Sequence, residues 1–219
     1  MYSFTISASS ENSSNIKFDK NITKERLNPL MNFWKSQYNQ ESIDIISRLI
    51  YKINSEDPIN IFIKSEATQL FELGKTVNKT ISDISGVLDL NQAITSSILN
   101  DAVCLLQNRI PETWVNIWDG PESPIGYLRG VVKKINAMNN YLKSAINENV
   151  LESNINLSEF LHPEAFINAL RQKSARSNKI PIDEMEIYST FEKVESGKNS
   201  MNNLYAKVIL FNFSFFEFL

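Results

Sequence analysis

The chain has 219 residues, of which 42% are hydrophobic and 11% aromatic, so it can bury the core of one large domain or two small ones. Its net charge of −3 excludes the basic footprint that a nucleic-acid-binding protein needs. The single cysteine, Cys104, excludes an intrachain disulfide and is typical of a reducing compartment. No apolar run reaches the length of about 18 residues that a transmembrane helix needs, so the sequence predicts no membrane span.

Serine and asparagine dominate the beginning of the chain, and this composition predicts a disordered N-terminal segment over residues 1–20. A short helix is then expected over Leu30–Tyr38, after Pro29. A better helix is expected over Glu41–Ile53, because four isoleucines recur at steps of three and four residues. These are Ile43, Ile46, Ile50 and Ile53.

The clearest helical period runs from Ile59 to about Ile84, and Ser85-Gly86 is expected to end it. Its apolar stripe consists of Ile63, Ala67, Leu70, Gly74, Val77, Ile81 and Ile84. A docked core helix is favoured over a coiled coil, since the small residues in the stripe suit close packing against a neighbour. Gly74-Lys75-Thr76 resembles the end of a phosphate-binding loop, but the first glycine of that motif falls at Gln69 and the flanks are helical. We therefore expect no nucleotide site here.

A second helix is expected from Asn91, as its N-cap, to about Gln107. Cys104 lies beside the apolar stripe of this helix, with no histidine or second cysteine near it in sequence. A small buried apolar residue is the favoured interpretation of Cys104, ahead of a nucleophile or metal ligand.

Two tryptophans, three prolines and an Arg-Gly pair between Pro111 and Gly130 predict a rigid corner that serves packing. A helix is expected to start at Pro124 with Ser123 as its N-cap. Its basic side chains are assigned to a solvated face, with a basic patch for tubulin or phosphate as the alternative. They are Arg129, Lys133, Lys134 and Lys143.

After a polar connection, His162-Pro163 is expected to open a helix that ends near Arg176, with Arg171, Lys173 and Arg176 suited to its C-terminal dipole. His162 is the single histidine and lacks partners at zinc-ligand spacing, so a helix-start role is expected for it. The fold class predicted is mainly α. A helical part over residues 21–180 is followed by an incomplete β unit over 181–219, which includes a strand over Met185–Phe191.

Two motifs in this sequence resemble the C-terminal region of dynein heavy chains, most closely the type that drives retrograde intraflagellar transport. The pattern Trp-x-Gly-Pro-Glu-x-Pro, followed by Tyr-Leu-Arg-Gly, is matched at Trp118, Gly120, Pro121, Glu122, Pro124, Tyr127, Leu128, Arg129 and Gly130. The second pattern is Leu-Ser-Glu, then His-Pro, then Phe-x-Asn-Ala-Leu-Arg-Gln and finally Ala-Arg. It is matched at Leu157, Ser158, Glu159, His162, Pro163, Phe166, Asn168, Ala169, Leu170, Arg171, Gln172, Ala175 and Arg176. The resemblance covers roughly residues 27–194 and is strongest over 111–176.

The resemblance implies a helical layer followed by a small β-barrel, truncated in this sequence, that packs across one face of the AAA+ ring of a minus-end-directed microtubule motor. It implies that ATP and magnesium are bound by upstream modules, so no cofactor or catalytic residue is expected here. The implied partners are the AAA+ ring of a dynein heavy chain, in cis or in trans, and the intermediate and light intermediate chains only through the full complex. The microtubule is an indirect partner, and the implied location is the cytoplasm and cytoskeleton, in a cilium or flagellum.

The residues expected to form packing or interface contacts are Trp114, Trp118, Tyr127, Leu128, Arg129, Phe160, Phe166 and Arg171. Trp118 is expected to be buried, so that its truncation to alanine would cost about 3–5 kcal/mol. A ring-bracing module is the first hypothesis. A free-standing helical interaction protein derived from such a domain is the alternative. An enzyme is disfavoured, since the sequence offers no nucleophile–base pair, metal-ligand spacing or phosphate loop.

Overall fold

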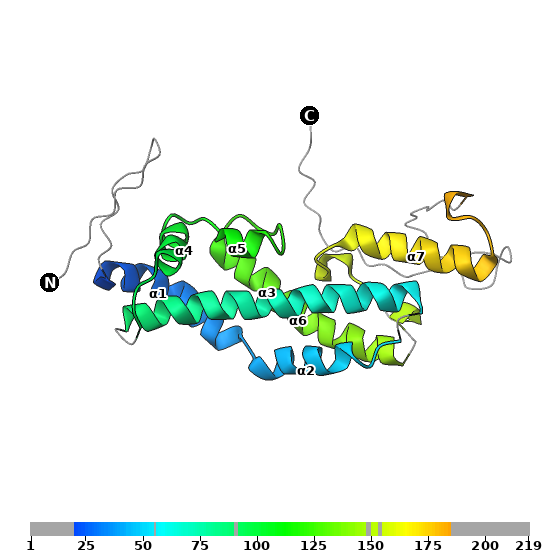
Figure 1. The fold of residues 1–219 in the computed structure, drawn as a ribbon, viewed down its shortest axis with the longest axis horizontal. Helices are drawn as coiled ribbons and strands as arrows, with labels where there is room; N and C mark the ends of the chain where they lie inside the picture. Colours follow the sequence, from blue (N-terminus) through cyan, green and yellow to red (C-terminus); the bar gives the residue numbers. More distant parts are fainter. Residues whose placement is uncertain (1–19, 55, 90–91, 148–149, 153–154, 185–219) are drawn as a thin grey trace, which may run out of the picture. The chain divides into compact units, whose positions relative to one another are not determined.

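The computed structural model describes residues 20–54, 56–89, 92–147, 150–152 and 155–184, and this part of the protein is mainly helical (Figure 1). The expected α class is therefore confirmed for the described residues. The expected disorder before Lys20 and the strand over residues 185–191 lie outside them. Where the description ends, Ile182–Glu184 forms the short 3-10 helix η3.

The chain divides into two compact units. Unit 1 comprises residues 1–39 and 72–132, and unit 2 comprises residues 40–71 and 133–219. The long helices α3, Pro58–Leu88, and α6, Pro124–Ile146, each contribute one part to each unit.

Helix α1, Lys20–Gln37, begins ten residues before the start expected from the sequence, and Pro29 lies inside it. The expected start after Pro29 was wrong, because proline often marks a helix start but here lies in the helix interior. Thr23, Leu27, Met31 and Trp34 lie at steps of four, four and three residues and are all buried. Proline in a helix interior costs about 3 kcal/mol. Pro29 faces solvent, where water can satisfy the carbonyl that its missing amide leaves free, and the buried face offsets the remaining cost.

Helix α2, Gln40–Ile50, buries Ile43, Ile46 and Ile50 as expected but ends three residues before the expected Ile53, which is buried outside the helix. Helix α3 starts at Pro58 because Asp57 caps it: Asp57 Oδ1 accepts the backbone N–H of Ile59 at 2.8 Å. The helix passes through Ser85-Gly86, where its end was expected, and stops at Leu88. All of its predicted stripe is buried, which confirms a docked core helix, and Gly74-Lys75-Thr76 lies within it.

Helix α4, Ser96–Leu106, starts later than expected because Thr95, rather than Asn91, is its N-cap. Thr95 Oγ1 accepts the N–H of Ile98 at 3.3 Å. The short helix α5, Glu112–Val115, follows Pro111. Ser123 caps α6 as expected, because its Oγ accepts the N–H of Gly126 at 3.3 Å.

The 3-10 helices η1, Val150–Glu152, and η2, Leu157–Glu159, lead from α6 to α7, Pro163–Asn178. His162 occupies the N-cap position of α7, as the sequence predicts. The helix ends two residues later than expected, because Lys179 adopts the left-handed conformation with φ 56° and closes it.

Candidate functional site

The residues expected at an interface fall into two side-chain clusters, one in each unit. Trp114, Trp118, Tyr127, Leu128 and Arg129 belong to unit 1, whereas Phe160, Phe166 and Arg171 belong to unit 2. No group of three or more histidine, cysteine or acidic side chains could hold a metal ion among the described residues.

Trp114 is the centre of the unit 1 cluster and is 0% exposed. Its indole Nε1 donates to Thr80 Oγ1 at 3.2 Å, which ties α5 to α3. Its ring stacks on Tyr127, with centroids 5.7 Å apart, which ties α5 to α6. A buried tryptophan needs a partner for its N–H, and Thr80 supplies one inside the core.

Tyr127 fixes the other end of the corner. Its hydroxyl lies 2.9 Å from the carbonyl oxygen of Trp114 and 3.0 Å from that of Trp118, so its one proton is shared between the last turn of α5 and a residue beyond the helix. Burial, reinforced by the charge of Asp119, raises the pKa of the Tyr127 hydroxyl well above its usual range. The hydroxyl thus stays protonated and donating.

Trp118 is only half-buried, so the expectation that it is buried was wrong; of the two tryptophans in this corner, Trp114 is the buried one. The indole of Trp118 lies against Tyr127 at a centroid distance of 4.9 Å and against two glycines. A Cβ added at Gly120 would lie 2.6 Å from Trp118 Cζ3, and one at Gly130 would lie 2.8 Å from Trp118 Cη2. Both glycines are therefore required for the Trp118 ring to be seated, which explains their place in the motif.

The Gly130→Ala variant is expected to be less stable than the wild type, although alanine is the better helix former by about 1 kcal/mol. The new methyl group would push Trp118 out of its seat, and such overpacking costs about 1–3 kcal/mol. Urea unfolding measures the difference. Gly86→Ala on α3 is the matched control, because its Cβ would meet only the end of the exposed Gln92 side chain, at 2.7 Å, and should stabilise the protein slightly. A stabilised Gly130→Ala variant would contradict this account of the motif.

Leu128 and Arg129, the remaining two residues of the unit 1 cluster, differ in exposure. Leu128 is fully buried, whereas Arg129 is exposed and places its guanidinium 5.7 Å from the ring centroid of Phe33 on α1. That cation–π contact is worth about 0.5–1 kcal/mol at an exposed site. The solvated face expected for Arg129 is confirmed.

In unit 2, Phe160 and Phe166 form an aromatic core with Phe62 of α3. The Phe62 ring meets Phe160 edge-on at 5.0 Å and Phe166 at 5.5 Å. Tyr141 of α6 packs on Phe160 at 4.9 Å. These contacts hold α7 beside the first part of α3 (Figure 1).

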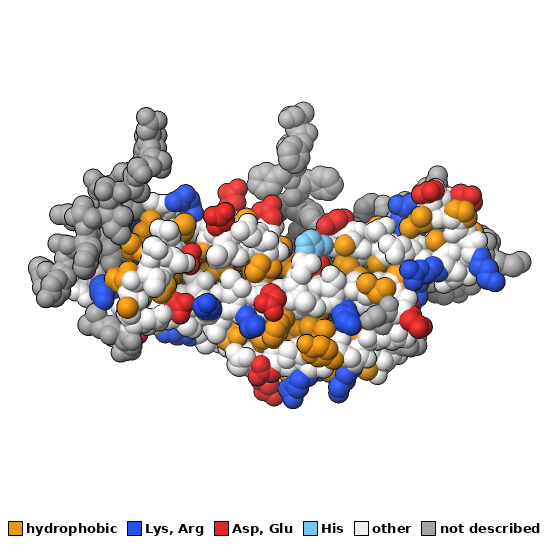
Figure 2. Space-filling model, viewed as in Figure 1, with side chains coloured by type: hydrophobic (Ala, Val, Ile, Leu, Met, Phe, Trp, Pro, Cys, Tyr) orange, Lys and Arg blue, Asp and Glu red, His pale blue; other side chains and the backbone are white. Residues whose placement is uncertain are grey.

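Glu66 of α3 is a buried carboxylate, 2% exposed, which sequence reasoning missed. It accepts the backbone N–H of Leu161 at 2.6 Å and that of His162 at 3.1 Å. The Nδ1 atom of His162 lies 2.7 Å from the same carboxylate. Because an ionised carboxylate only accepts, Nδ1 carries the proton. The imidazole, 38% exposed, reaches the surface (Figure 2).

Lys134 of α6 is 7% exposed, so the prediction that it lies on a solvated face was wrong. Its ammonium donates to the carbonyl of Ser158 at 2.8 Å and to that of Phe160 at 2.5 Å. Burial lowers the pKa of Lys134 to about 8, with the nearby Glu66 charge opposing that shift. The two backbone carbonyls thus give the buried ammonium of Lys134 its hydrogen-bond acceptors.

The backbone from Ser158 to His162 is thus held from two sides: Glu66 binds its N–H groups and Lys134 binds its carbonyls. We call these two side chains and that backbone the polar clamp. Tyr141 extends it, since its hydroxyl donates to Glu159 Oε2 at 2.8 Å and accepts the N–H of Asn156 at 3.1 Å. Any sliding of α3 along α6 within unit 2 would break part of this set.

The sequence contains a signal from which both members of the clamp could have been found. Glu66 follows Ile59 and Ile63 at steps of four and three, and Lys134 follows Tyr127 and Val131 at the same steps. Both charges therefore lie on the apolar face of their helices, where a charge is costly unless it is paired. A charged residue in phase with a buried stripe would have identified each.

The basic residues of α7 do more than complement its dipole, which is the role that the sequence predicts for them. Arg171 Nη2 donates to the carbonyl of Ile182 at 3.1 Å. Lys173 pairs with Asp57 Oδ2 at 2.5 Å, and Arg176 Nη1 donates to the carbonyl of Glu56 at 3.0 Å. The bonds of Lys173 and Arg176 fasten the end of α7 to the turn that starts α3, whereas the bond of Arg171 joins α7 to η3. Cys104, expected to be buried, is only half-buried.

Alkaline titration should detect the burial of Tyr127 and Tyr141, the two tyrosines that are buried among the described residues. Burial, with the hydrogen bond and charge of Glu159, raises the pKa of Tyr141 to about 12, and the pKa of Tyr127 is raised further. Raised folded-state pKa values mean that their stability contribution is complete below pH 10 and is lost as the pH rises through the folded values. Difference absorbance at 295 nm between the wild type and the Tyr127→Phe or Tyr141→Phe variant should show that each of these two hydroxyls is still protonated at about pH 11. Ionisation of either hydroxyl below that pH, with the fold intact, would contradict the burial.

The helical packing and the two clusters define, over the described residues, a mainly helical module with one side-chain cluster in each unit. Its family is established by comparison: the model of the C-terminal domain of dynein heavy chains matches residues 3–207, and the protein belongs to that family. It is 33% identical to the cytoplasmic dynein 2 heavy chain 1 of Rattus norvegicus and 32% identical to that of Homo sapiens, each over 80% of the present sequence. The relative in Chlamydomonas reinhardtii is 29% identical over 62% of the present sequence.

The protein spans about 4% of the length of the rat and human heavy chains that it matches. It therefore corresponds to one segment of such a protein. Among the described residues, no helix is both long and apolar enough to cross a membrane.

Proposed function

We propose that this protein is the ring-bracing C-terminal module of a dynein heavy chain of the intraflagellar-transport type, within a minus-end-directed microtubule motor. The observation that carries the proposal is that each unit of this dynein C-terminal domain is fastened by a cluster that joins three elements. Trp114 joins α5 to α3 and α6, and the polar clamp joins the turn before α7 to α3 and α6. A brace needs such rigidity.

The proposed mechanism is mechanical. In unit 2, the clamp atoms can all be satisfied only when α3 and α6 hold one register, because Glu66 and Lys134 reach the same five-residue backbone segment from different helices. A fully satisfied buried polar network is rigid, because breaking one of its bonds leaves a buried polar group unpaired at high cost. A module built in this way would limit rearrangements of the ring to which it is docked.

In this proposal the module has no ATP site, and ATP and magnesium belong to upstream modules. The amides of Gly74-Lys75-Thr76 lie inside α3 and are committed to its helical bonds, which supports that assignment. The partner is the AAA+ ring of a dynein heavy chain, in cis or in trans. Intermediate and light intermediate chains and the microtubule are reached through the full complex, in the cytoplasm and the cilium.

The test is a graft in which this protein replaces the C-terminal domain of a cytoplasmic dynein 2 motor. Microtubule-stimulated ATPase activity should be that of a motor with its C-terminal domain, and the module alone should hydrolyse no ATP. Glu66→Ala should shift the grafted motor toward the rate of a motor without the domain, whereas Glu72→Ala, at an exposed site on the same helix, should not. ATP turnover by the module alone, or a wild-type graft that behaves like the deletion, would refute the proposal.

A further inference from the structure

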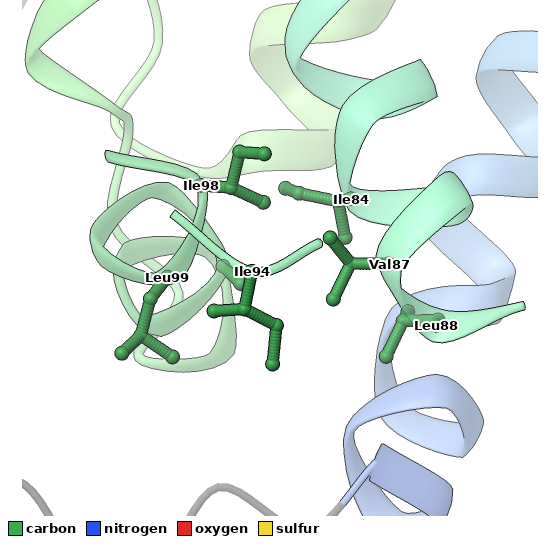
Figure 3. Close-up of a pocket in the computed structure, with 7 residues that line it drawn as sticks. Ile84, Val87, Leu88, Ile94, Ile98 and Leu99 are labelled. Carbon is green, nitrogen blue, oxygen red and sulfur yellow. The ribbon is translucent and has the colours of Figure 1, made fainter. Parts of the chain in front are cut away.

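The hollow between the end of α3 and the start of α4 is too small to bind a ligand (Figure 3). Its lining is apolar and includes Ile84 and Val87 of α3 and Ile98 of α4. Its free space of about 10 Å³ holds one water molecule at most. The surface around α5, also in unit 1, is different, because acidic and hydrophobic side chains lie together there (Figure 2).

Apolar side chains of α5 and of the connection that follows it reach water. Val115 is 41% exposed, although it directly follows the buried Trp114. Trp118 is half-buried and Pro121 is exposed. The rings of Trp118 and Pro121 lie side by side on α6, because a Cβ added at Gly130 would meet Trp118 Cη2 at 2.8 Å and Pro121 Cδ at 4.0 Å. We call Val115, Trp118 and Pro121 the apolar ridge.

Each member of the apolar ridge has a carboxylate beside it in the sequence. Glu112 lies three residues before the ridge valine on α5, so the two side chains share a face. Asp119 directly follows the ridge tryptophan, and Glu122 directly follows the ridge proline. All three carboxylates are exposed, and none makes an ion pair with another residue that the structure describes. The apolar ridge is therefore flanked by uncompensated negative charge.

The basic side chains nearest in sequence leave this charge in place. No lysine or arginine occurs between residues 110 and 128. Arg109 donates from its guanidinium to the side-chain oxygen of Gln107, and Arg129 lies over the ring of Phe33 on α1. A surface that combines apolar side chains with unpaired charges of one sign is complementary to a partner that carries apolar side chains and the opposite charge.

The backbone that carries the ridge is held in one conformation. The hydroxyl of Tyr127 lies 2.9 Å from the carbonyl oxygen of Trp114 and 3.0 Å from that of Trp118. Ser123 Oγ, at the end of the connection, accepts the N–H of Gly126 at 3.3 Å. A surface that is already ordered loses little conformational entropy on binding. Tryptophan is also enriched among the residues that dominate binding energy.

We propose that a basic segment of the motor ring docks on this surface. Apolar side chains of that segment cover the ridge and complete the burial of Trp118, and flanking lysine or arginine side chains pair with Glu112, Asp119 and Glu122. The assignment rests on the proposed function, which makes the ring the partner of this module. It adds the face of unit 1 through which the ring is bound and the chemistry of the segment that binds there.

Charge reversal tests the electrostatic part in the full-length module, labelled at its N-terminus and titrated with a cytoplasmic dynein 2 motor that lacks its C-terminal domain. Glu112→Lys with Glu122→Lys should weaken binding about tenfold at low salt, and the loss should shrink as salt is raised. Glu25→Lys with Glu72→Lys makes the same change in net charge at exposed sites elsewhere in unit 1 and should leave binding nearly unchanged. Equal losses in the two pairs would overturn the proposal.

A neutral substitution tests the apolar part. Val115→Ser should also weaken binding to the motor, whereas Ile22→Ser, at a 57% exposed site on α1, should not. Circular dichroism checks that each variant is folded. If the wild-type module binds the motor and the variants at Glu112, Val115 and Glu122 bind equally well, the proposed function stands and this docking surface is wrong. If the wild-type module does not bind, both are wrong.

Discussion

Replacing Trp114 with alanine is expected to lower the free energy of unfolding by about 3–5 kcal/mol, the cost of truncating a fully buried tryptophan. The indole is 0% exposed, and the variant would also leave Thr80 without its donor and Tyr127 without its stacking partner. Urea unfolding followed by far-UV circular dichroism measures the change.

Trp118→Ala is the internal comparison for this prediction. Trp118 is half-buried and sits four residues along the same corner, so its loss should cost clearly less than that of Trp114. Equal costs, or a larger cost at Trp118, would mean that the corner is organised around the other ring and that the assignment of Trp114 as its centre is wrong.

The Glu66→Ala variant should lose about 3–5 kcal/mol, since removing one member of a buried charged set leaves its partners uncompensated. Two backbone N–H groups and the imidazole N–H of His162 would lose their acceptor at once. Lys134 would lose the carboxylate charge that opposes the effect of its burial, so its pKa should fall below its present value of about 8. Chemical denaturation at pH 7 gives the first quantity, and NMR titration of the lysine side chain gives the second.

Two further variants separate the buried charge from general effects of substitution. Glu72→Ala removes an exposed carboxylate from the same helix and should change stability by less than about 0.5 kcal/mol. Glu66→Gln keeps the shape and one acceptor oxygen but must turn an N–H₂ group toward a donor, so it should fall between the alanine variant and the wild type. A neutral Glu66→Ala variant would show that the clamp does not hold the turn before α7.

The sequence predicts the parts of this fold that depend on local pattern. The buried stripe of α3, the isoleucine face of α2, the cap at Ser123 and the helix start at His162 all follow from local sequence within one helix. The start of α1 does not, because the tertiary burial of Leu27, Met31 and Trp34 outweighs the local signal of Pro29. The β unit expected after residue 181 stays a prediction, since only Ile182–Glu184 of it is described.

In the candidate site, too, local pattern predicts some features and tertiary contacts decide the others. The motif residues Trp118, Gly120, Tyr127 and Gly130 do meet in one corner, but which tryptophan is buried depends on the position of Thr80 on another helix. The polar clamp joins residues 95 and 96 positions apart in sequence, and no local rule predicts such a contact. What the sequence does carry is the conflict of Glu66 and Lys134 with their apolar stripes, which indicates that each has a partner without indicating which.

Sedimentation velocity of a mixture tests most directly whether this module binds to a motor ring. The mixture would contain this protein and a cytoplasmic dynein 2 motor from which the C-terminal domain has been removed. The account predicts that the 25.1 kDa module sediments with the motor at equal stoichiometry, and that the Glu66→Ala variant does so less well than Glu72→Ala. A module that sediments alone at its own mass, with the motor in excess and both proteins folded, would contradict it.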